Sequence, residues 1–322
     1  MKNATRGSYK HITNLIMALS IAGCVSACSV LGISFDSPKV NNSQFVAVLD
    51  NGSFLNSQHG ESWELVHGNE SIVWNNVVTT NNQLFAVGLN GEMRNSIDGQ
   101  QWSTVIDKDH RLWLYDIVYA QKKYVAVGMN GTVVSASAKL KEWTVHHTPT
   151  SSWLNGISYG NGVFVACGSN GTIISSVKAE RWNSENSTSN DWLSSISFLE
   201  QRFFVTGSNG ALLSSVDGHN WHNLDSHTNN WLYSIAYGNN MYMVVGDYST
   251  VLVSHDGINW ESQTTNLPSS YVLKSVVYAR GEFWLGGSRG LVASSVDGKT
   301  WVVHSVPTKR NITALTYADV DN

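Results

Sequence analysis

The sequence predicts an all-β fold, a seven-bladed β-propeller with four-stranded blades, closed three strands plus one by the C-terminal strand. Three observations predict it. Tryptophan recurs about every 40 residues along most of the 322-residue chain. Each repeat contains four short strand patterns, and one further strand pattern follows the last complete repeat. A period near 40 residues with four strands per unit is typical of propeller blades.

The tryptophan spacing defines the repeat. One series has intervals of 39 to 41 residues and comprises Trp63, Trp102, Trp143, Trp182, Trp221, Trp260 and Trp301. A second series has intervals of 39 or 40 residues and comprises Trp74, Trp113, Trp153, Trp192 and Trp231. Asn-Gly pairs recur with the same period, beginning at Asn51-Gly52, but the sixth repeat departs with Ser249-Thr250. Seven repeats therefore indicate seven blades.

The four strands of one repeat can be delimited by their turn residues. The patterns cover Leu154–Tyr159, Val163–Gly168, Thr172–Ser176 and the residues from Trp182 onward. Asn161-Gly162 and Asn170-Gly171 separate the first three strands, and such pairs favour the positive φ angles of two-residue hairpin turns. The strands are apolar on both faces, as expected of blades that are packed between neighbouring blades.

The two ends of the repeat region predict how the ring closes. The first repeat begins at Phe45 and lacks its opening strand, whereas Asn311–Tyr317 matches the opening strand of the other repeats. The C-terminal strand can therefore complete the first blade and remove the open edge of the sheet. We expect the propeller to span residues 45–320.

The N-terminal segment is predicted to direct export. A basic start and an apolar stretch at Ile12–Gly23 indicate a signal segment over residues 1–23. The sequence Ile21-Ala22-Gly23-Cys24 resembles a bacterial lipobox, which implies an acylated Cys24 and a tether over residues 24–44. Cys28 is the alternative lipidation site, and ordinary cleavage with free secretion is the alternative fate. The expected location is the cell envelope, facing the periplasm or the exterior.

Charge and composition exclude one class of function. Removal of residues 1–23 leaves 17 Lys and Arg residues against 24 Asp and Glu residues, a formal charge of −7. An acidic chain of this kind is not expected to bind nucleic acid or anionic lipid headgroups through charge. Contact with the membrane is therefore expected only through the lipid anchor. Cys167 lies in an apolar strand pattern and is predicted to be a small buried residue.

A short motif joins the third and fourth strands in four repeats. It reads Ser-x-Asp-Gly-x-x-Trp and contains Asp98 and Trp102, Asp217 and Trp221, Asp256 and Trp260, and Asp297 and Trp301. This motif resembles the Asp-box, or bacterial neuraminidase (BNR), repeat in a form one residue shorter. An Asp before Gly can accept hydrogen bonds from the amides of its own turn, so these residues are predicted to be structural.

The resemblance covers nearly the whole mature chain and extends to several families of different function. Sialidases need three arginines around one carboxylate, but the arginines of this chain lie mostly at non-equivalent repeat positions and the Arg-Ile-Pro segment is absent. Xyloglucan hydrolases pair two propellers, and sortilin-type receptors also carry such repeats. The photosystem II assembly-factor family agrees best, and that resemblance implies one seven-bladed, exported, non-enzymatic propeller.

The mouth of the central channel is the predicted binding site. The first residue of each opening strand should lie there, which places Trp74, Trp113, Trp153, Trp192 and Trp231 around it, with Tyr271 or Val272 and Asn311 in the other two repeats. Indoles in such a ring can stack on sugars, aromatic groups or apolar side chains of a partner. The alternative is that each indole packs between blades. Asp116 is the polar residue expected to take part in recognition.

The function predicted from these patterns is binding. The sequence shows no catalytic constellation, no metal-ligand spacing and no cofactor motif, so we expect a monomeric, non-enzymatic scaffold that binds a protein partner. A carbohydrate-binding propeller is the first alternative, because it would use the same tryptophans. A glycoside hydrolase with unmatched catalytic residues is the second alternative.

Overall fold

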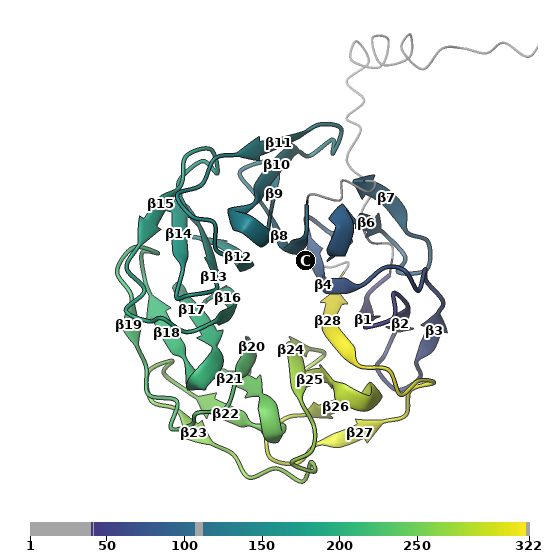
Figure 1. Ribbon diagram of the computed structural model, residues 1–322. Helices are drawn as coiled ribbons and strands as arrows, with labels where there is room; N and C mark the ends of the chain where they lie inside the picture. Colours follow the sequence, from purple (N-terminus) through teal and green to yellow (C-terminus); the bar gives the residue numbers. More distant parts are fainter. Residues whose placement is uncertain (1–39, 41, 107–111, 320–322) are drawn as a thin grey trace, which may run out of the picture. The chain divides into compact units, whose positions relative to one another are not determined.

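The computed structural model describes residue 40, residues 42–106 and residues 112–319. These residues form seven four-stranded antiparallel sheets around a central channel (Figure 1), so the predicted fold class, blade number and strand number are confirmed. The predicted signal segment, with Cys24 and Cys28, lies outside the described residues. Among the described residues, none of the helices is long and apolar enough to span a membrane.

The blades follow one another along the chain, and within each blade every strand pairs with the next strand of the same sheet. Blade 1 comprises β28 (Ile312–Ala318), β1 (Gln44–Leu49), β2 (Phe54–Ser57) and β3 (Glu64–Val66). Blade 2 comprises β4 (Trp74–Thr80), β5 (Gln83–Gly88), β6 (Met93–Ser96) and β7 (Ser103–Ile106). Blade 3 comprises β8 (Leu114–Ala120), β9 (Lys123–Gly128), β10 (Val133–Ser137) and β11 (Trp143–His146).

The remaining four blades repeat this order. Blade 4 comprises β12 (Leu154–Gly160), β13 (Val163–Gly168), β14 (Ile173–Ser176) and β15 (Asn183–Glu185). Blade 5 comprises β16 (Leu193–Leu199), β17 (Arg202–Gly207), β18 (Leu212–Ser215) and β19 (His222–Asn223). Blade 6 comprises β20 (Leu232–Gly238), β21 (Met241–Gly246), β22 (Val251–Ser254) and β23 (Glu261–Ser262). Blade 7 comprises β24 (Leu273–Ala279), β25 (Glu282–Gly287), β26 (Val292–Ser295) and β27 (Val302–His304).

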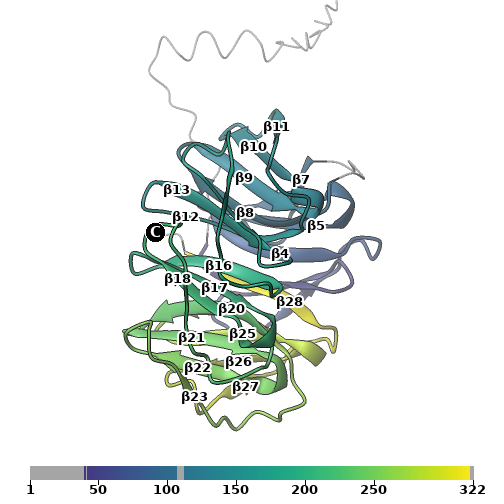
Figure 2. The same ribbon diagram turned by 60° about the vertical axis from the view of Figure 1, so that its left-hand side comes forward.

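The C-terminal strand closes the ring as predicted. β28 pairs antiparallel with β1, in a register that runs from Gln44 opposite Ala318 to Leu49 opposite Ile312. The innermost strand of blade 1 therefore comes from the other end of the chain (Figure 1). In the side view the twisted sheets lie one against the next (Figure 2), as strand twist requires in a propeller.

Antiparallel pairing gives the ring two distinct faces. The innermost strands begin on the tryptophan face, which is defined by Trp113, Trp153, Trp192 and Trp231. The turns between the third and fourth strands lie on the opposite, aspartate-turn face, which is defined by Asp98, Asp217, Asp256 and Asp297. β1 occupies the second position of its blade, so the chain enters the propeller on the aspartate-turn face.

The core lies between the blades, because each sheet is apolar on both faces. In β13 the alternate residues Phe164 and Ala166 pack against blade 3. Val165 and Cys167 pack against blade 5. This period of two explains the apolar strand patterns of the sequence. Cys167 is completely buried, which confirms its predicted role, and burial raises the pKa of its thiol.

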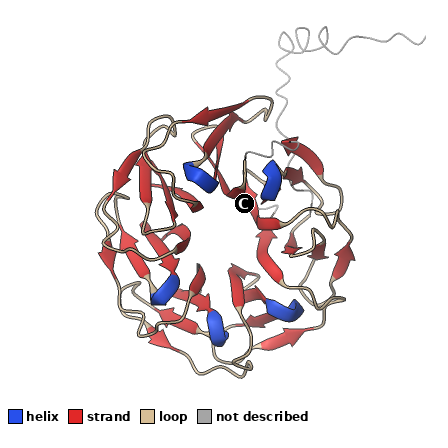
Figure 3. Ribbon diagram, viewed as in Figure 1, coloured by secondary structure: helices blue, strands red, loops and turns tan. Residues whose placement is uncertain are grey.

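The turns between the second and third strands confirm the prediction for the Asn-Gly pairs. In blade 2 the turn contains η1 (Leu89–Gly91), in which Asn90 and Gly91 have φ angles of 60° and 75°. Such short 3-10 turns lie on the inner side of the ring (Figure 3). In blade 6 the equivalent pair is Tyr248-Ser249 in η4 (Asp247–Ser249), not Ser249-Thr250, and both residues have φ of 55°.

Tyr248 offers a test of this turn. Its side chain is 69% exposed, so its cost to stability comes from the left-handed backbone rather than from lost contacts. We expect Tyr248→Asn to raise the free energy of unfolding by about 0.5–1 kcal/mol, because Asn tolerates this conformation better. Urea denaturation of both proteins measures the difference. A destabilised variant would show that the Tyr248 side chain makes a compensating contact.

Candidate functional site

The innermost strands form the wall of the channel, and each contains a β-bulge near its start. The register shifts after the first residue pair in every first strand, for example between Leu154 and Gly156. The extra residue of each bulge lines the channel, and the seven extra residues are Asn75, Tyr115, Asn155, Ser194, Tyr233, Lys274 and Thr313. A bulge redirects a side chain in this way. Together with their neighbours they enclose a cavity of about 310 Å³.

The five tryptophans predicted at the channel mouth do not all occupy equivalent positions. One backbone hydrogen bond identifies the equivalent mouth residue in each blade. An amide in the turn between the second and third strands donates it to the carbonyl of the residue that directly precedes the first strand. The residues that accept this bond are Val73, Trp113, Trp153, Trp192, Trp231, Val272 and Asn311. The equivalent of the four tryptophans in blade 2 is therefore Val73. Trp74 pairs with Gly88, as Leu114 pairs with Gly128.

Trp74 therefore does not lie at the channel mouth, where the sequence spacing placed it. It is only 1% exposed and packs between blades 1 and 2 against Phe54, with 5.6 Å between the ring centres. Its indole Nε1 donates a hydrogen bond to the carbonyl oxygen of Gly52 at 3.0 Å. For this residue the alternative of packing between blades describes the structure. The one-residue difference arises because 39 residues separate Trp74 from Trp113, while the structural repeat there is 40.

The other four tryptophans form a crescent over four consecutive blades, which we call the tryptophan crescent: Trp113, Trp153, Trp192 and Trp231. All four are partly exposed. Trp153 stacks on Tyr115 and meets Trp192 edge to face, with ring centres 5.9 and 5.5 Å apart. Trp192 and Trp231 also line the channel cavity.

The crescent ends at a cationic side chain. Trp231 stacks on Tyr233 at 5.7 Å, and its Nε1 donates to the hydroxyl of Ser194 at 2.6 Å. The ammonium group of Lys274 lies 3.4 Å from the centre of the Tyr233 ring, a cation–π contact. Burial lowers the pKa of Lys274, while the carboxylate of Asp247 opposes the effect.

Tyr115, Tyr233 and Lys274 are not among the site residues that the sequence patterns predicted. Each is the extra residue of a bulge and lies two residues after the mouth position of its blade. The sequence signal that could have identified them is that the residue at this position varies from blade to blade, in the order Asn, Tyr, Asn, Ser, Tyr, Lys and Thr. Nothing in the strand pattern predicted the bulge, which is what turns these side chains toward the channel. Tyr271 lies one residue before the mouth position of blade 7, which is Val272, and packs against the core between blades 6 and 7.

Asp116 lines the channel cavity, but its carboxylate is hydrogen-bonded within the ring. Its Oδ1 accepts hydrogen bonds from Asn76 Nδ2 at 3.0 Å and from the amide of Ile117 at 2.9 Å. Its Oδ2 accepts a bond from the amide of Ile157 in the next blade at 2.9 Å. Burial raises the pKa of Asp116 to about 7, although these three hydrogen bonds lower it.

Serine takes the same position in other blades and forms the same link. Ser234 accepts a bond from the amide of Val276 at 3.2 Å, and Ser275 accepts one from the amide of Leu315 at 3.1 Å. Asp116 is thus one of several residues that tie the innermost strand of one blade to the next. Both of its carboxylate oxygens accept hydrogen bonds from the ring itself.

The aspartate turns have the geometry that the motif predicted. In each, the Asp Oδ1 accepts bonds from two amides of its own turn. For Asp217 these are the amides of His219 and Asn220, at 2.9 and 2.8 Å. Asp98, Asp256 and Asp297 form the same pair of bonds. Trp102, Trp221 and Trp301 donate their Nε1 to the carbonyl of the turn glycine, whereas Trp260 Nε1 has no partner. These residues therefore stabilise hairpins.

No protein-family model and no curated protein matches the sequence. Among solved structures, the chain is similar to YCF48 bound to a D1 peptide, with 17% identity and a TM-score of 0.64 over 80% of this chain and 89% of that one. For YCF48 from Cyanidioschyzon merolae the values are 15%, 0.62, 80% and 92%. For virginiamycin B lyase from Staphylococcus aureus they are 12%, 0.57, 83% and 86%. At these identities the similarity shows the propeller fold alone. The family resemblance predicted from the motifs is therefore supported as far as the fold.

The pKa of Asp116 gives a testable pH dependence. The native pKa of about 7 lies above the ordinary value of 3.8, so the native state binds this proton more tightly than the unfolded chain does. The contribution of Asp116 to stability therefore falls as the pH rises from 4 to 7, by on the order of 2–4 kcal/mol. We expect Asp116→Ser, which copies blades 6 and 7, to remove this contribution and to be more stable than the wild type at pH 8.

Denaturant unfolding of both proteins at pH 4, 5, 6, 7 and 8 measures this difference. The other titrating groups are common to the two proteins, so only the difference between their free energies of unfolding is compared. The same pH slope in wild type and variant would contradict the assignment of a raised pKa to Asp116.

Proposed function

We propose that this chain is an exported, lipid-anchored, non-enzymatic propeller that binds a protein partner through the tryptophan crescent. The observation that carries the proposal is the crescent itself, in which four partly exposed indoles lie on consecutive blades beside the channel cavity. The few residues that contribute most to the free energy of protein interfaces are enriched in tryptophan, tyrosine and arginine. Aromatic side chains that are held by stacking lose little conformational entropy on binding.

The side chains around the crescent favour recognition over catalysis. The described residues that line the cavity carry amides and hydroxyls, one cation at Lys274 and one carboxylate at Asp116. That carboxylate is engaged in three hydrogen bonds within the ring. Amides and hydroxyls can pair with the backbone of an extended peptide, and the indoles can cover its apolar side chains.

One similar structure supports a protein partner rather than a sugar. It is a propeller with a D1 peptide bound, so a ring of this fold can hold a peptide. A carbohydrate is the alternative ligand, because the same indoles can stack on sugar rings. The faces of Trp153 and Trp231 are partly occupied by Tyr115 and Tyr233, which leaves less flat surface for a pyranose.

The crescent can be tested by substitution in the native host. We expect Trp192→Ala combined with Trp231→Ala to lower recovery of a cross-linked protein partner by at least about tenfold, because hot-spot residues of this kind contribute 2 kcal/mol or more. Val216→Ala is the control, since Val216 is exposed on the aspartate-turn face. Unchanged recovery with a folded double variant would exclude the crescent. Sugar binding on a glycan array that depends on the same tryptophans would replace the protein partner with a carbohydrate.

The proposed anchor has a separate test. Cys24 follows the apolar segment directly in the Ile-Ala-Gly-Cys pattern. We expect Cys24→Ser to abolish incorporation of radiolabelled palmitate and to release the protein from the membrane fraction, while Cys28→Ser changes neither. Labelling that survives Cys24→Ser but is lost with Cys28→Ser would move the lipid to Cys28.

A further inference from the structure

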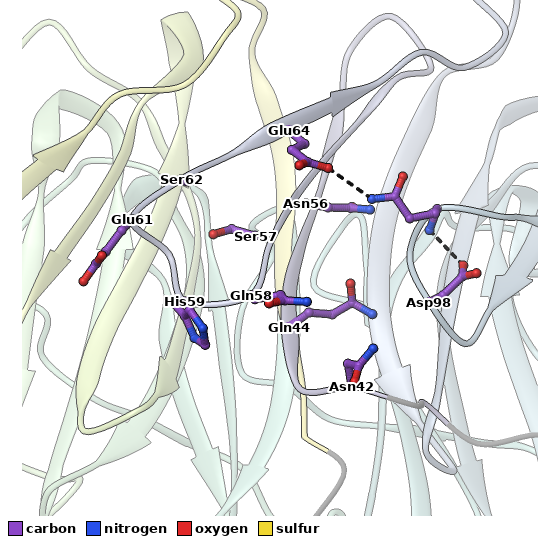
Figure 4. Close-up of a pocket in the computed structure, with 11 residues that line it drawn as sticks. Asn42, Gln44, Asn56, Ser57, Gln58, His59, Glu61, Ser62, Glu64 and Asp98 are labelled. Atoms are coloured by element: carbon purple, nitrogen blue, oxygen red, sulfur yellow. Dashed lines mark hydrogen bonds between the residues drawn. The ribbon is translucent and has the colours of Figure 1, made fainter.

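A second cavity, of about 440 Å³, lies between blades 1 and 2 on the aspartate-turn face. It is separate from the tryptophan crescent, which lies on the opposite face. Figure 4 shows its lining side chains, which come from the start of β1 and the residues before it, the end of β2, the turn between β2 and β3, β3 itself and the turn between β6 and β7. Its lining residues include Gln44, Asn56, Glu64, Asp98 and Gln100.

The floor of this cavity contains buried polar atoms without partners. Gln44 is 6% exposed and Asn56 is 4% exposed. Asn56 Nδ2 donates to the carbonyl of Gly99 at 2.6 Å. Gln44 Nε2 and Asn56 Oδ1, by contrast, have no hydrogen-bond partner. Figure 4 shows both amide groups directed toward the turn that carries Asp98. A native fold rarely leaves such atoms unpaired, so a ligand that pairs with them would gain binding free energy.

The same position is satisfied internally in other blades. Asn56 precedes the last residue of its strand. In four other blades the equivalent residue pairs with a side chain of a neighbouring strand: Asn95 with Gln83, Ser135 with His146, Ser175 with Glu185 and Ser294 with His304. Blade 1 departs from this pattern, so the unpaired amide is a property of this cavity and not of the repeat.

The equivalent position between blades 3 and 4 shows what chemical group fits. By strand register Lys123 is the equivalent of Gln44, and Glu180 is the equivalent of Gln100. Lys123 Nζ donates to the carbonyl of Lys178 at 2.9 Å and lies 3.3 Å from the Glu180 carboxylate. An ammonium group of the chain itself therefore occupies that position. Between blades 1 and 2 both positions are glutamine, and the described residues that line the cavity supply no Lys or Arg side chain in its place.

The cavity between blades 1 and 2 has acceptors for such a group. Asp98 Oδ1 takes the bonds of its turn, which leaves Oδ2 toward the cavity. Burial raises the pKa of Asp98, but the hydrogen bonds that its carboxylate receives from the amides of Gln101 and Gln100 and from Ser96, together with its own amide, bring the pKa below its ordinary value, which keeps the group ionised. Glu64 lies on the opposite wall, with its Oε2 3.5 Å from Gln100 Nε2. The lining residues include no Lys or Arg.

We propose that this cavity binds a basic side chain of a peptide, whose ammonium or guanidinium group takes the place that the Lys123 ammonium takes between blades 3 and 4. The cation donates hydrogen bonds to Asn56 Oδ1 and to the carboxylates of Glu64 and Asp98. Gln44 Nε2 donates to a carbonyl oxygen of the same peptide. This site is independent of the tryptophan crescent, so either can fail without the other.

The probes are N-acetyl-arginine N-methylamide and its lysine counterpart, each titrated into the full chain while the side-chain amide signals of Gln44 and Asn56 are followed by NMR. The uncharged citrulline compound is the control. We expect at least one basic probe to shift both signals and to bind about tenfold more tightly than citrulline. Equal affinity of the citrulline compound, or signals that do not move with either basic probe, would overturn the proposal.

Substitutions test the geometry. Gln44→Lys combined with Gln100→Glu copies the Lys123–Glu180 pair, and we expect it to abolish binding while thermal stability is kept. Glu64→Gln should weaken binding about three- to tenfold. Glu142→Gln makes the same charge change at an exposed residue of blade 3, in the turn between β10 and β11, and should leave the affinity within about twofold. A folded double variant that binds the probe as tightly as the wild type would contradict the proposed site.

Discussion

The pairing of β28 with β1 is the constraint on which the rest of the structure depends. Every blade in this chain is apolar on both faces, so no blade can be left without a neighbour on either side. An open array of seven blades would expose two such faces and the edges of its first and last sheets. The six residue pairs between β28 and β1 bring the last repeat against the first. The cores between blades 1 and 2 and between blades 7 and 1 then both form.

The closed ring also gives the channel its properties. Seven innermost strands begin on the same face, and each bulge turns one side chain inward at the same depth. The channel wall is therefore a ring of seven equivalent backbone positions, and the side chains at these positions differ between blades. Tyr115, Tyr233 and Lys274 stand where other blades have Asn, Ser or Thr. A repeat that holds its backbone constant can vary recognition at these positions without a cost to the cores between blades.

The repeat made the fold predictable, whereas the sites depend on details finer than the period. Tryptophan spacing, strand patterns and the extra C-terminal strand were sufficient for the blade number and the closure. Trp74 shows the limit, since one residue of spacing separates an exposed mouth position from a buried one. Tyr248-Ser249 adopts the turn of an Asn-Gly pair because the flanking strands impose it, which local propensity does not predict. The cavity at Gln44 and Asn56 lies between two blades and requires the register of both.

Closure also brings the two ends of the propeller together. The Ser43 hydroxyl donates to the Asp319 carboxylate at 3.0 Å, on either side of the seam where β1 meets β28. A short linker across this seam would make the chain circular, and new ends could then be cut in a surface turn of any blade. The seam also determines how the ring responds to mechanical load. A pull on the segment before β1 acts on a strand that is bonded to β28 on one side and to β2 on the other, so two ladders share the force.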